Sequence, residues 1–204
     1  MSKPPLPITI ATFNTGKLRE YRSMLSGLNV DLQDLSDFNN VQEIAETAAT
    51  FAGNAALKAS GYAELTRTLT LADDSGLEVA AMGGRPGVLS ARYGGAATSF
   101  DDKMRLILAE IAENRSADRS ARFVCEIAVA DERGIILYKS RGVCSGTIAL
   151  EPRGKGGFGY DPIFLPDGLD QSFGELSPSV KQRISHRAAA FDQIIPYLRD
   201  YTAI

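Results

Sequence analysis

Two adjacent carboxylates, Asp73 and Asp74, follow an apolar run and precede Ser75 and Gly76 in the sequence LADDSGLEV. Neighbouring carboxylates repel each other, which raises the pKa of one of them unless a cation compensates. Mg²⁺ gives that compensation and prefers carboxylate and phosphate oxygens as ligands. The pair is thus consistent with a metal site and a general base for water at the end of a strand. Asp, Ser and Gly are all common turn residues, however, and this motif alone favours a solvated turn.

A second motif, TFNTGK at residues 12–17, lies between an apolar run and an amphipathic stretch. Backbone N–H groups at a helix start can bind a phosphate, and Lys17 can add a point charge. The number and spacing of glycines do not match a Walker A loop. The alternative is an ordinary strand-to-helix turn that Asn14 caps, and this motif alone leaves the two interpretations evenly balanced.

A third motif, GKGGFGYDP at residues 154–162, combines glycines with Phe158 and Tyr160. Glycines let the backbone approach a ligand closely, and both aromatic rings offer faces on which a base can stack. A mobile hairpin loop is the alternative. The aromatic side chains favour ligand binding.

A fourth motif, KQRISHR at residues 181–187, begins the last predicted helix and contains the one histidine of the chain. Ser185 can cap this helix while His186 and Arg187 direct donors at a ligand near its first turn. A lone His is more often structural, and Lys and Arg also suit a solvated helix face. Taken together, the four motifs supply the parts that a nucleoside triphosphate site with Mg²⁺ requires.

Hydrophobic periodicity predicts the elements that position these motifs. Apolar spacing and helix-start signals predict helices, and alternation on either side of the DERG turn predicts an antiparallel hairpin. We therefore expect an α/β fold with a mixed sheet. The expected elements are a strand at 8–12, a helix at 15–27, a helix at about 50–66, a strand that leads to the acidic pair, a helix after the SFDD of 99–102, strands around 123–129 and 135–150, and a helix at 186–201 that contains Pro196.

Composition and charge exclude several classes of protein. The 204 residues are 44% hydrophobic, which allows one large domain or two joined lobes with a continuous core. The net charge of −3 argues against a nucleic-acid partner. The N-terminal sequence lacks a signal-peptide core and no stretch approaches the ~20 apolar residues that span a bilayer, so we expect a cytoplasmic protein with no membrane partner. Cys125 and Cys144 then fit reduced core residues, and any metal is expected to be a hard cation held by carboxylates.

Six blocks of the sequence, in this order, resemble the inosine triphosphate pyrophosphatase family. The resemblance extends from about residue 8 to about residue 199. The blocks are TFNTGKLRE at 12–20, NAALKA at 54–59, ADDSGLE at 72–78, GGRPGVLSARY at 83–93, GGFGYDPIF at 156–164 and ISHRA at 184–188. The resemblance implies one domain over residues 1–204, an elongated mixed β-sheet flanked by helices in two lobes with the nucleotide cleft between them, and a homodimer. It also implies Mg²⁺-dependent hydrolysis of ITP, dITP and XTP to the monophosphate and pyrophosphate, which keeps these nucleotides out of DNA and RNA.

The resemblance assigns roles to residues of this chain. Asp74 matches the proton acceptor that activates water, and Asp73 or Asp74 helps to hold Mg²⁺. The residues that match substrate contacts are Thr12, Phe13, Asn14, Thr15, Gly16 and Lys17 for the triphosphate, Ser75 and Lys181 for other parts of the nucleotide, Phe158, Gly159, Tyr160 and Asp161 for packing on the base, and His186 and Arg187 for reading the purine.

The chemistry of the residues agrees with these roles. In-line attack at the α-phosphorus needs a water, a base and cations that offset charge on the departing pyrophosphate; Asp74, Lys17 and Lys58 can supply the last two together with Mg²⁺. Lys58 lies four residues after Asn54, so both share one helical face. Donors such as Arg187 favour the 6-oxo group of hypoxanthine and xanthine over the 6-amino group of adenine.

One region departs from the family pattern. The family often has an acidic pair before Thr-Gly and a Glu before the helical Asn, whereas Ala45, Ala48 and Gly53 stand at these places. Glu46 is then the expected metal ligand, with Glu43 as the fallback. The departure allows a weakened Mg²⁺ site or a shifted ligand.

Two other functions share parts of this pattern. A phosphoacceptor receiver module also uses an acidic pair, a Thr and a Lys to hold phosphate without hydrolysing a nucleotide. Its acidic pair follows the first strand, however, and its chain is shorter. The septum-inhibitor-like nucleotide pyrophosphatases share the reaction but prefer modified pyrimidine or guanine nucleotides, and the SHR sequence argues against them.

Overall fold

The computed structural model describes residues 4–114 and 118–203 of the chain. Its elements are the strands β1 (Leu6–Ile10), β2 (Val30–Asp34), β3 (Leu69–Val79), β4 (Ser120–Ala130), β5 (Ile136–Ile148) and β6 (Phe164–Pro166), and the α-helices α1 (Thr15–Leu25), α2 (Phe51–Thr66), α3 (Phe100–Glu113), α4 (Pro178–Ile184) and α5 (His186–Ala203). In this part of the chain, six strands form one sheet in the order β2-β1-β3-β4-β5-β6. The β1–β2 and β1–β3 pairs are parallel and the β5–β6 pair is antiparallel, so the predicted α/β fold with a mixed sheet is confirmed.

The chain divides into two compact units, each with its own hydrophobic core. Unit 1 consists of Met1–Asp74, Cys125–Gly142 and Ala188–Ile204, and unit 2 consists of Ser75–Val124 and Val143–Arg187. Strands β3, β4 and β5 contribute residues to both units. The prediction of a single domain over residues 1–204 stays a prediction.

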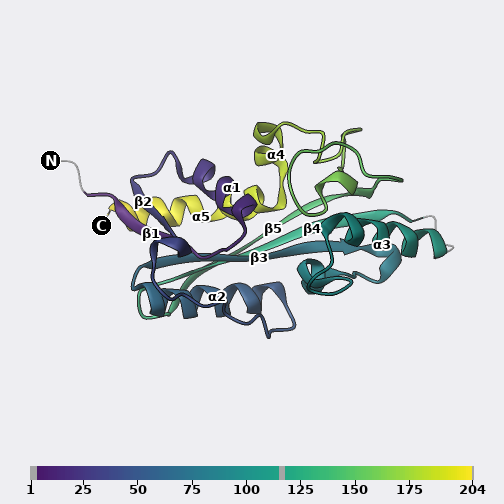
Figure 1. Cartoon of the computed structure of the whole chain (residues 1–204). Helices are drawn as coiled ribbons and strands as arrows, with labels where there is room; N and C mark the ends of the chain where they lie inside the picture. Colours follow the sequence, from purple (N-terminus) through teal and green to yellow (C-terminus); the bar gives the residue numbers. More distant parts are fainter. Residues whose placement is uncertain (1–3, 115–117, 204) are drawn as a thin grey trace. The chain divides into compact units, whose positions relative to one another are not determined.

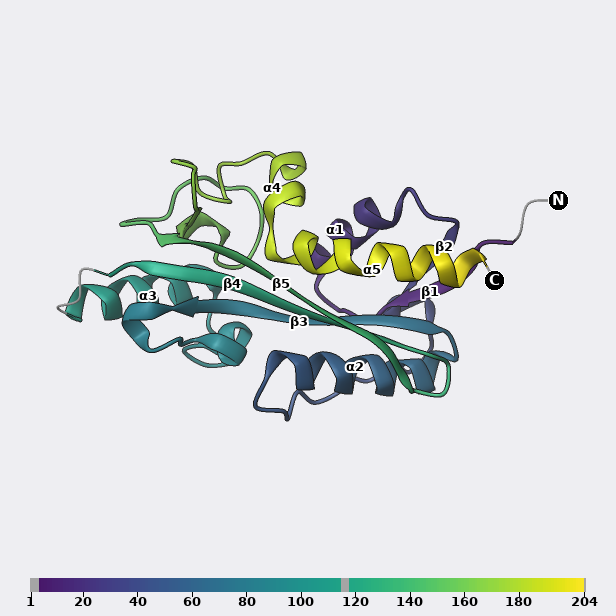
Figure 2. The same cartoon turned by 180° about the vertical axis from the view of Figure 1, so that it is seen from behind.

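In unit 1, apolar side chains cover both faces of the sheet. Figures 1 and 2 show α2 on one side of β3 and the helices α1 and α5 on the other. Leu69 and Leu71 of β3 belong to the core that includes residues of α1 and α5, whereas Ala72 belongs to the core that includes residues of α2. Because successive side chains of a strand point to opposite faces, this alternation fixes the direction of the residues that follow in β3.

Helix caps in unit 1 match the sequence signals. Asn14 caps α1, where its side chain accepts from the N–H groups of Gly16 and Lys17, so this predicted cap is confirmed. Thr50 caps α2 by accepting from the Gly53 N–H. At the other end of α2, Arg67 has a left-handed backbone with φ of 58°, and its N–H donates to a carbonyl of the last turn.

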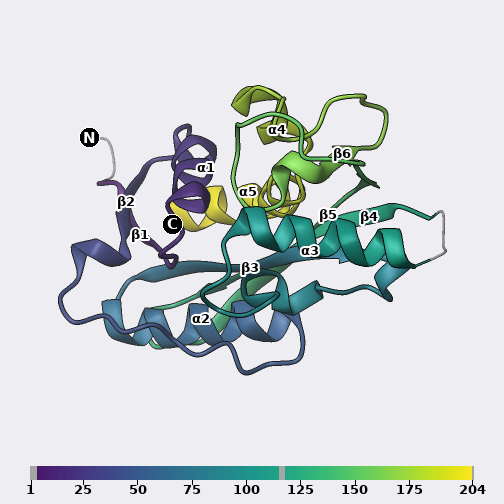
Figure 3. The same cartoon turned by 45° about the vertical axis from the view of Figure 1, so that its right-hand side comes forward.

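In unit 2, α3 packs its apolar stripe against the sheet. Ser99 caps the helix by accepting from the Asp102 N–H, and Met104, Ile107 and Ile111 are buried in the core of this unit, as the sequence predicts. Figure 3 shows α3 alongside the unit 2 parts of β3 and β4. Among the helices of residues 4–114 and 118–203, none combines the length and the apolar character needed to cross a lipid bilayer.

The basic segment at 181–187 does not begin one helix. Ser177 caps the short helix α4, which ends at Ile184, and α5 begins at His186 after the extended backbone of Ser185. Lys181 therefore lies on α4, and its predicted place at the start of the last helix is wrong. The break has a local cause, since Ser185 leaves the helical region with ψ of 157°.

Candidate functional site

The acidic pair lies within β3 and not at its end. The strand continues to Val79, and Asp73 and Asp74 are only 2% and 6% exposed. The predicted strand end is therefore wrong, and so is the alternative of a solvated turn. Carboxylates buried this deeply need charged or hydrogen-bonding partners, and both residues have them.

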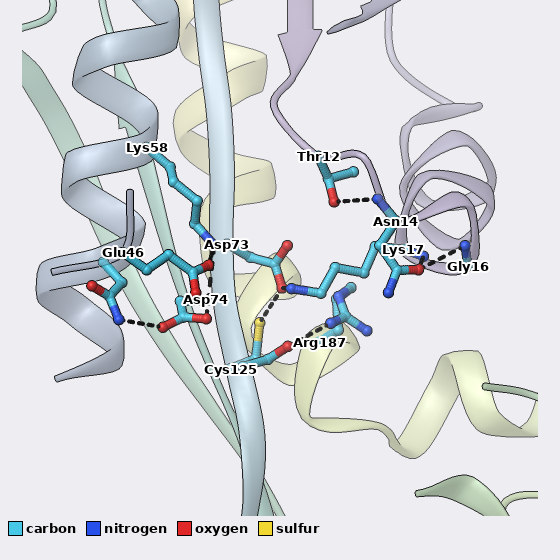
Figure 4. A network of polar contacts seen from close by, with 12 residues as sticks. Thr12, Asn14, Gly16, Lys17, Glu46, Lys58, Asp73, Asp74, Cys125 and Arg187 are labelled. Carbon is cyan, nitrogen blue, oxygen red and sulfur yellow. Dashed lines mark hydrogen bonds and ion pairs between the residues drawn. The ribbon is translucent and has the colours of Figure 1, made fainter. Parts of the chain in front are cut away.

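Asp73 faces the side of the sheet that α1 covers. Its Oδ2 lies 2.9 Å from the Lys17 Nζ, and the Cys125 Sγ donates to the same oxygen at 3.6 Å. Figure 4 shows Lys17 extending from the start of α1 to this carboxylate. The predicted phosphate-loop lysine is thus held by a buried carboxylate of β3.

Asp74 faces the opposite side, which α2 covers. The Asn54 Nδ2 donates to its Oδ2 at 3.0 Å, and its Oδ1 lies 3.7 Å from the Lys58 Nζ. Asn54 and Lys58 reach the carboxylate together because they are one helical turn apart on α2. The contact with Asn54 is a part of the site that sequence reasoning missed, although the spacing of Asn54 and Lys58 was a signal for it.

Glu46 completes a charged group around Lys58. Its Oε1 lies 2.7 Å from the Lys58 Nζ, so Lys58 contacts two carboxylates, one from Glu46 and one from Asp74. Burial lowers the pKa of Lys58, but the charges of Asp74, Asp73 and Glu46 outweigh burial and raise that pKa above its usual value. Lys58 is therefore a cation at neutral pH.

The same surroundings act on Asp74 in the opposite sense. Burial raises the pKa of Asp74 above its usual value; the Lys58 charge works to lower it, and the Glu46 charge adds to the rise. A carboxylate with a raised pKa is a stronger proton acceptor than an exposed one. Asp74 thus has the electrostatic setting of a general base.

The residues predicted to hold a metal lie on both faces of β3. Asp74 and Glu46 converge on Lys58, which shows that a positive charge is accommodated between these oxygens. Asp73 is directed to Lys17 on the other face of β3, and Glu43 is exposed. Within the described residues, no three His, Cys, Asp or Glu side chains form a group that could hold an ion. Asp74 and Glu46 are the hard oxygen donors that fit Mg²⁺, and their role as ligands stays a prediction.

The turn at 12–17 combines both interpretations of its sequence. The Asn14 side chain caps α1 and the Asn14 N–H donates to the Thr12 Oγ1 at 3.1 Å, as an ordinary strand-to-helix turn requires. Lys17 is nevertheless held by Asp73, and the helix start carries a positive partial charge. Phe13 is exposed and packs edge-on against Tyr62. The roles of Thr12 to Lys17 in binding phosphate stay predictions.

In unit 2, two buried cations lie near the ring of Phe158. The Lys181 Nζ is 4.4 Å from the ring centroid, and the guanidinium carbon of Arg187 is 5.8 Å from it. Lys181 and Arg187 are 5% and 1% exposed. The Arg187 guanidinium donates to the Ser75 Oγ at 2.9 Å. The structure therefore brings together four residues predicted to contact the substrate.

Asp161 shapes the glycine-rich loop. Its Oδ2 accepts from the Lys181 Nζ at 2.6 Å and from the Phe158 N–H at 2.8 Å. Gly157 has a positive φ of 71°, and a side chain there would collide with the Asp161 carboxylate. The loop is thus folded around a buried ion pair, which differs from the mobile hairpin that the sequence left open.

Two predicted substrate contacts belong to the core of unit 2. Tyr160 is buried, donates from its hydroxyl to the Ser90 carbonyl at 2.7 Å and packs edge-on against Phe100. The ring thus packs in the core, and its predicted role in offering a face to a base stays a prediction. His186 is also buried, with its ring stacked at 4.7 Å on Phe123. This stacking fits the structural role that is common for a lone His, and the predicted contact of His186 with the purine stays a prediction.

Both cysteines are buried, so their predicted place in the core is confirmed. Cys125 lies in unit 1 and Cys144 in unit 2. The contact of the Cys125 thiol with Asp73 was not predicted, because it depends on how β3 and β4 pair.

The chain is similar to known proteins over nearly its whole length. Residues 8–197 match the model of the Ham1 family. A dITP/XTP pyrophosphatase of Oceanobacillus iheyensis is 41% identical over 192 residues, which cover 94% of this chain and 97% of the relative. A dITP/XTP pyrophosphatase of Mycobacterium tuberculosis is 42% identical over 195 residues, with 94% and 95% covered. The structure of a HAM1 protein from Coxiella burnetii has a TM-score of 0.88 at 39% identity, with 96% of this chain and 99% of that chain covered. The Staphylococcus aureus Ham1 protein has a TM-score of 0.84 at 34% identity, with the same coverage.

Proposed function

The chain belongs to the Ham1 family, and from this premise we propose that it hydrolyses non-standard purine nucleoside triphosphates to the monophosphate and pyrophosphate. The names of the relatives support dITP and XTP as substrates, and ITP carries the same base as dITP. The observation that carries the proposal is the unit 1 cluster, where the buried Asp74 carboxylate with its raised pKa lies beside the cationic Lys58. Such hydrolysis removes these nucleotides from the pool that supplies DNA and RNA synthesis.

Asp74 is the proton acceptor in this proposal. Attack of water on the α-phosphorus requires a base within hydrogen-bond reach of the water. Within the acidic pair of β3, Asp73 is engaged by Lys17 at 2.9 Å, whereas the nearest Asp74 oxygen lies 3.7 Å from Lys58. The looser contact favours Asp74 for proton transfer.

Lys17 and Lys58 offset the charge that develops on the departing pyrophosphate. Each ammonium is largely buried and is held by a carboxylate, Lys17 by Asp73 and Lys58 by Glu46. Preorganised cations in a site with little water stabilise transition-state charge more strongly than cations in solution. The lysines thus serve the phosphate end of the substrate.

Mg²⁺ is part of the proposal, with Asp74 and Glu46 as its ligands. Both are hard oxygen donors that already accommodate the charge of Lys58. When bound, Mg²⁺ would neutralise charge on phosphate oxygens. Because Ala45, the neighbour of Glu46, has no oxygen donor in its side chain, Glu46 carries more of the binding.

The unit 2 cluster is assigned to the purine base. Arg187 is a donor and cannot accept a hydrogen bond, so it suits the 6-oxo oxygen of hypoxanthine or xanthine. The 6-amino group of adenine would instead present a donor to a donor. Phe158 adds an apolar ring, and Lys181 adds a second buried cation next to it. This group of side chains supports selection of 6-oxo purines.

Homodimer formation and a cytoplasmic location complete the proposal. The first follows from the family resemblance and the second from the sequence-based expectation of a cytoplasmic protein. Light scattering of the purified protein tests the first, since a dimer would have twice the mass of the 21.9 kDa chain. Fractionation of cells that express the protein tests the second.

The experiment that tests the proposed activity compares ITP, dITP, XTP, GTP and ATP with Mg²⁺ and with EDTA, measuring pyrophosphate and orthophosphate separately. We expect Mg²⁺-dependent release of pyrophosphate from ITP, dITP and XTP, with little from ATP or GTP. Guanine also carries a 6-oxo group, so the donor of Arg187 accounts for the rejection of ATP, and the rejection of GTP requires a different contact. Orthophosphate as the first product would move the attack to the γ-phosphorus and overturn the mechanism. Binding without turnover would favour a non-catalytic nucleotide-binding module.

A further inference from the structure

The side-chain amide of Asn54 is bonded at both ends. Asn54 is only 1% exposed, and its Nδ2 donates to the Asp74 Oδ2 at 3.0 Å. Its Oδ1 accepts from the backbone N–H of Ala48 at 2.9 Å. An N–H group can only donate and an ionised carboxylate can only accept, so these two partners permit a single orientation of the amide. Asn54 thereby holds one oxygen of Asp74 in place.

We propose that Asn54 is a positioning residue for Asp74, an inference that rests on the proposed function of this site. Its amide occupies Oδ2 and directs Oδ1 toward the side of Lys58, where Oδ1 accepts the proton of the attacking water. Proton transfer requires a heavy-atom distance of about 2.6–3.2 Å. A displacement of about 1 Å in a reacting group can lower the rate roughly 100-fold. Asn54 affects kcat by orienting the Asp74 carboxylate and does not contact the substrate.

The seat of Asn54 depends on the close approach of Ala48 to the first turn of α2. Gly53 directly precedes Asn54, and a Cβ at Gly53 would lie 2.6 Å from the Ala48 Cβ and 3.1 Å from the Thr50 Oγ1. The first distance is shorter than carbon atoms approach each other in proteins, so any side chain at position 53 must move Ala48. The backbone N–H of Ala48 would then lose its hydrogen bond to the Asn54 Oδ1. The missing side chain at Gly53 therefore allows Ala48 to lie close enough to hold the Asn54 amide.

The same contact places the segment that carries Glu46. Glu46 lies two residues before Ala48 and pairs with Lys58 at 2.7 Å. The absence of a side chain at Gly53 thus allows the backbone at Ala48 to reach Asn54 while Glu46 reaches Lys58. Gly53 thus serves both the contact of Ala48 with Asn54 and the contact of Glu46 with Lys58.

The test compares four variants by kcat and KM for dITP and by thermal unfolding. Asn54→Leu removes both hydrogen bonds at similar side-chain volume. Gly53→Ala introduces the steric clash, and the double variant Ala48→Gly with Gly53→Ala removes the atom that clashes. Ser60→Ala is the matched control, because Ser60 also lies on α2 and makes one hydrogen bond, to the Gly134 carbonyl, without contacting Asp74.

We expect Asn54→Leu to lower kcat by roughly 10- to 100-fold while KM changes less than about 3-fold, because an interaction that aims the base acts in the transition state. Gly53→Ala should lower kcat in the same way, and the double variant should recover most of it. Ser60→Ala should keep wild-type kcat. A role in the fold alone would instead lower the unfolding temperature without a selective loss of kcat.

Wild-type kcat in Asn54→Leu, a loss carried by KM, or no recovery in the double variant would overturn the positioning role while leaving the proposed function intact. If Asn54→Leu does not fold, Gly53→Ala and its compensated partner decide the question, since both retain Asn54. A wild-type protein that hydrolyses none of dITP, ITP and XTP would instead overturn the proposed function itself.

Discussion

The two units bury their charged side chains in different settings. In unit 1, each carboxylate of the acidic pair has its own lysine, Lys17 for Asp73 and Lys58 for Asp74. In unit 2, the cations Lys181 and Arg187 lie near the ring of Phe158. Alternating acids and cations suit proton transfer and phosphate charge, whereas cations beside an aromatic ring suit a flat, uncharged base. Under the proposed function, unit 1 carries out the reaction and unit 2 recognises the base.

Replacement of Asp74, the proposed general base in unit 1, should have the largest effect on activity. We expect Asp74→Asn to lower kcat by roughly 10²- to 10⁴-fold, because the amide keeps the shape of the carboxylate but cannot accept the proton. Pyrophosphate release measures the loss, and a thermal unfolding curve close to that of the wild type shows that the variant is folded. Wild-type turnover by a folded variant would remove Asp74 from the role of base.

Loss of the Asp161 charge in unit 2 should lower the free energy of unfolding. Asp161→Asn leaves the buried Lys181 cation without its carboxylate, which we expect to cost about 3–5 kcal/mol of the free energy of unfolding. Glu175→Gln is the control, because its pair with Arg153 is more exposed and should change stability by about 0–1 kcal/mol. Urea unfolding monitored by circular dichroism measures both. Equal losses would show that the buried pair does not organise this loop.

A smaller effect should sharpen the division between chemistry and recognition. Arg187→Ala should lower the ratio of ITP to ATP hydrolysis by about 10- to 100-fold, because the variant loses the donor that suits a 6-oxo group. Rates measured for the two nucleotides separately give this ratio. Arg183→Ala on the exposed surface of α4 serves as the control. An unchanged ratio in Arg187→Ala would count against base reading by unit 2.

The smallest effect concerns the thiols, one in each unit. Burial, aided by the charge of Asp167, raises the pKa of Cys144 to about 11, so its thiolate is scarce at pH 8 and increases only as the pH approaches that value. Alkylation by iodoacetamide at pH 8 should therefore be slow in the folded protein and fast in urea. Mass spectrometry of peptides that contain Cys125 or Cys144 measures both rates. Rapid modification of folded Cys144 would contradict its burial.

The sequence predicted elements best where local signals were complete. The Ser99 cap with Asp102 and the apolar stripe of α3 lie within one segment, as does the Asn14 cap of α1. The acidic pair was misplaced at a strand end because β3 is buried on both faces and shows no simple alternation. Its polar residues are tolerated by partners on α1 and α2, which are remote in sequence.

The candidate site was predicted in its membership more than in its geometry. Residues of the third and fourth motifs do meet in unit 2, since Phe158 contacts both Lys181 and Arg187. Burial of Tyr160 was not predicted, because an aromatic side chain in a glycine-rich sequence carries no local mark of whether it faces a ligand or the core. The orientation of the Asn54 amide depends on a hydrogen bond from the backbone N–H of Ala48. Every residue type except proline has this donor, so the sequence could not indicate the contact.

The opposite directions of Asp73 and Asp74 limit how β3 can change in evolution. A strand exchanges the faces of all its side chains when its register moves by one residue. Insertion or deletion of a single residue between Leu71 and Asp73 would therefore turn each carboxylate to the face of the sheet on which the other's lysine lies. A change of two residues would restore the faces but move both carboxylates roughly 7 Å along the strand, away from Lys17 and Lys58. The length of β3 before the acidic pair is therefore fixed more strictly than its sequence.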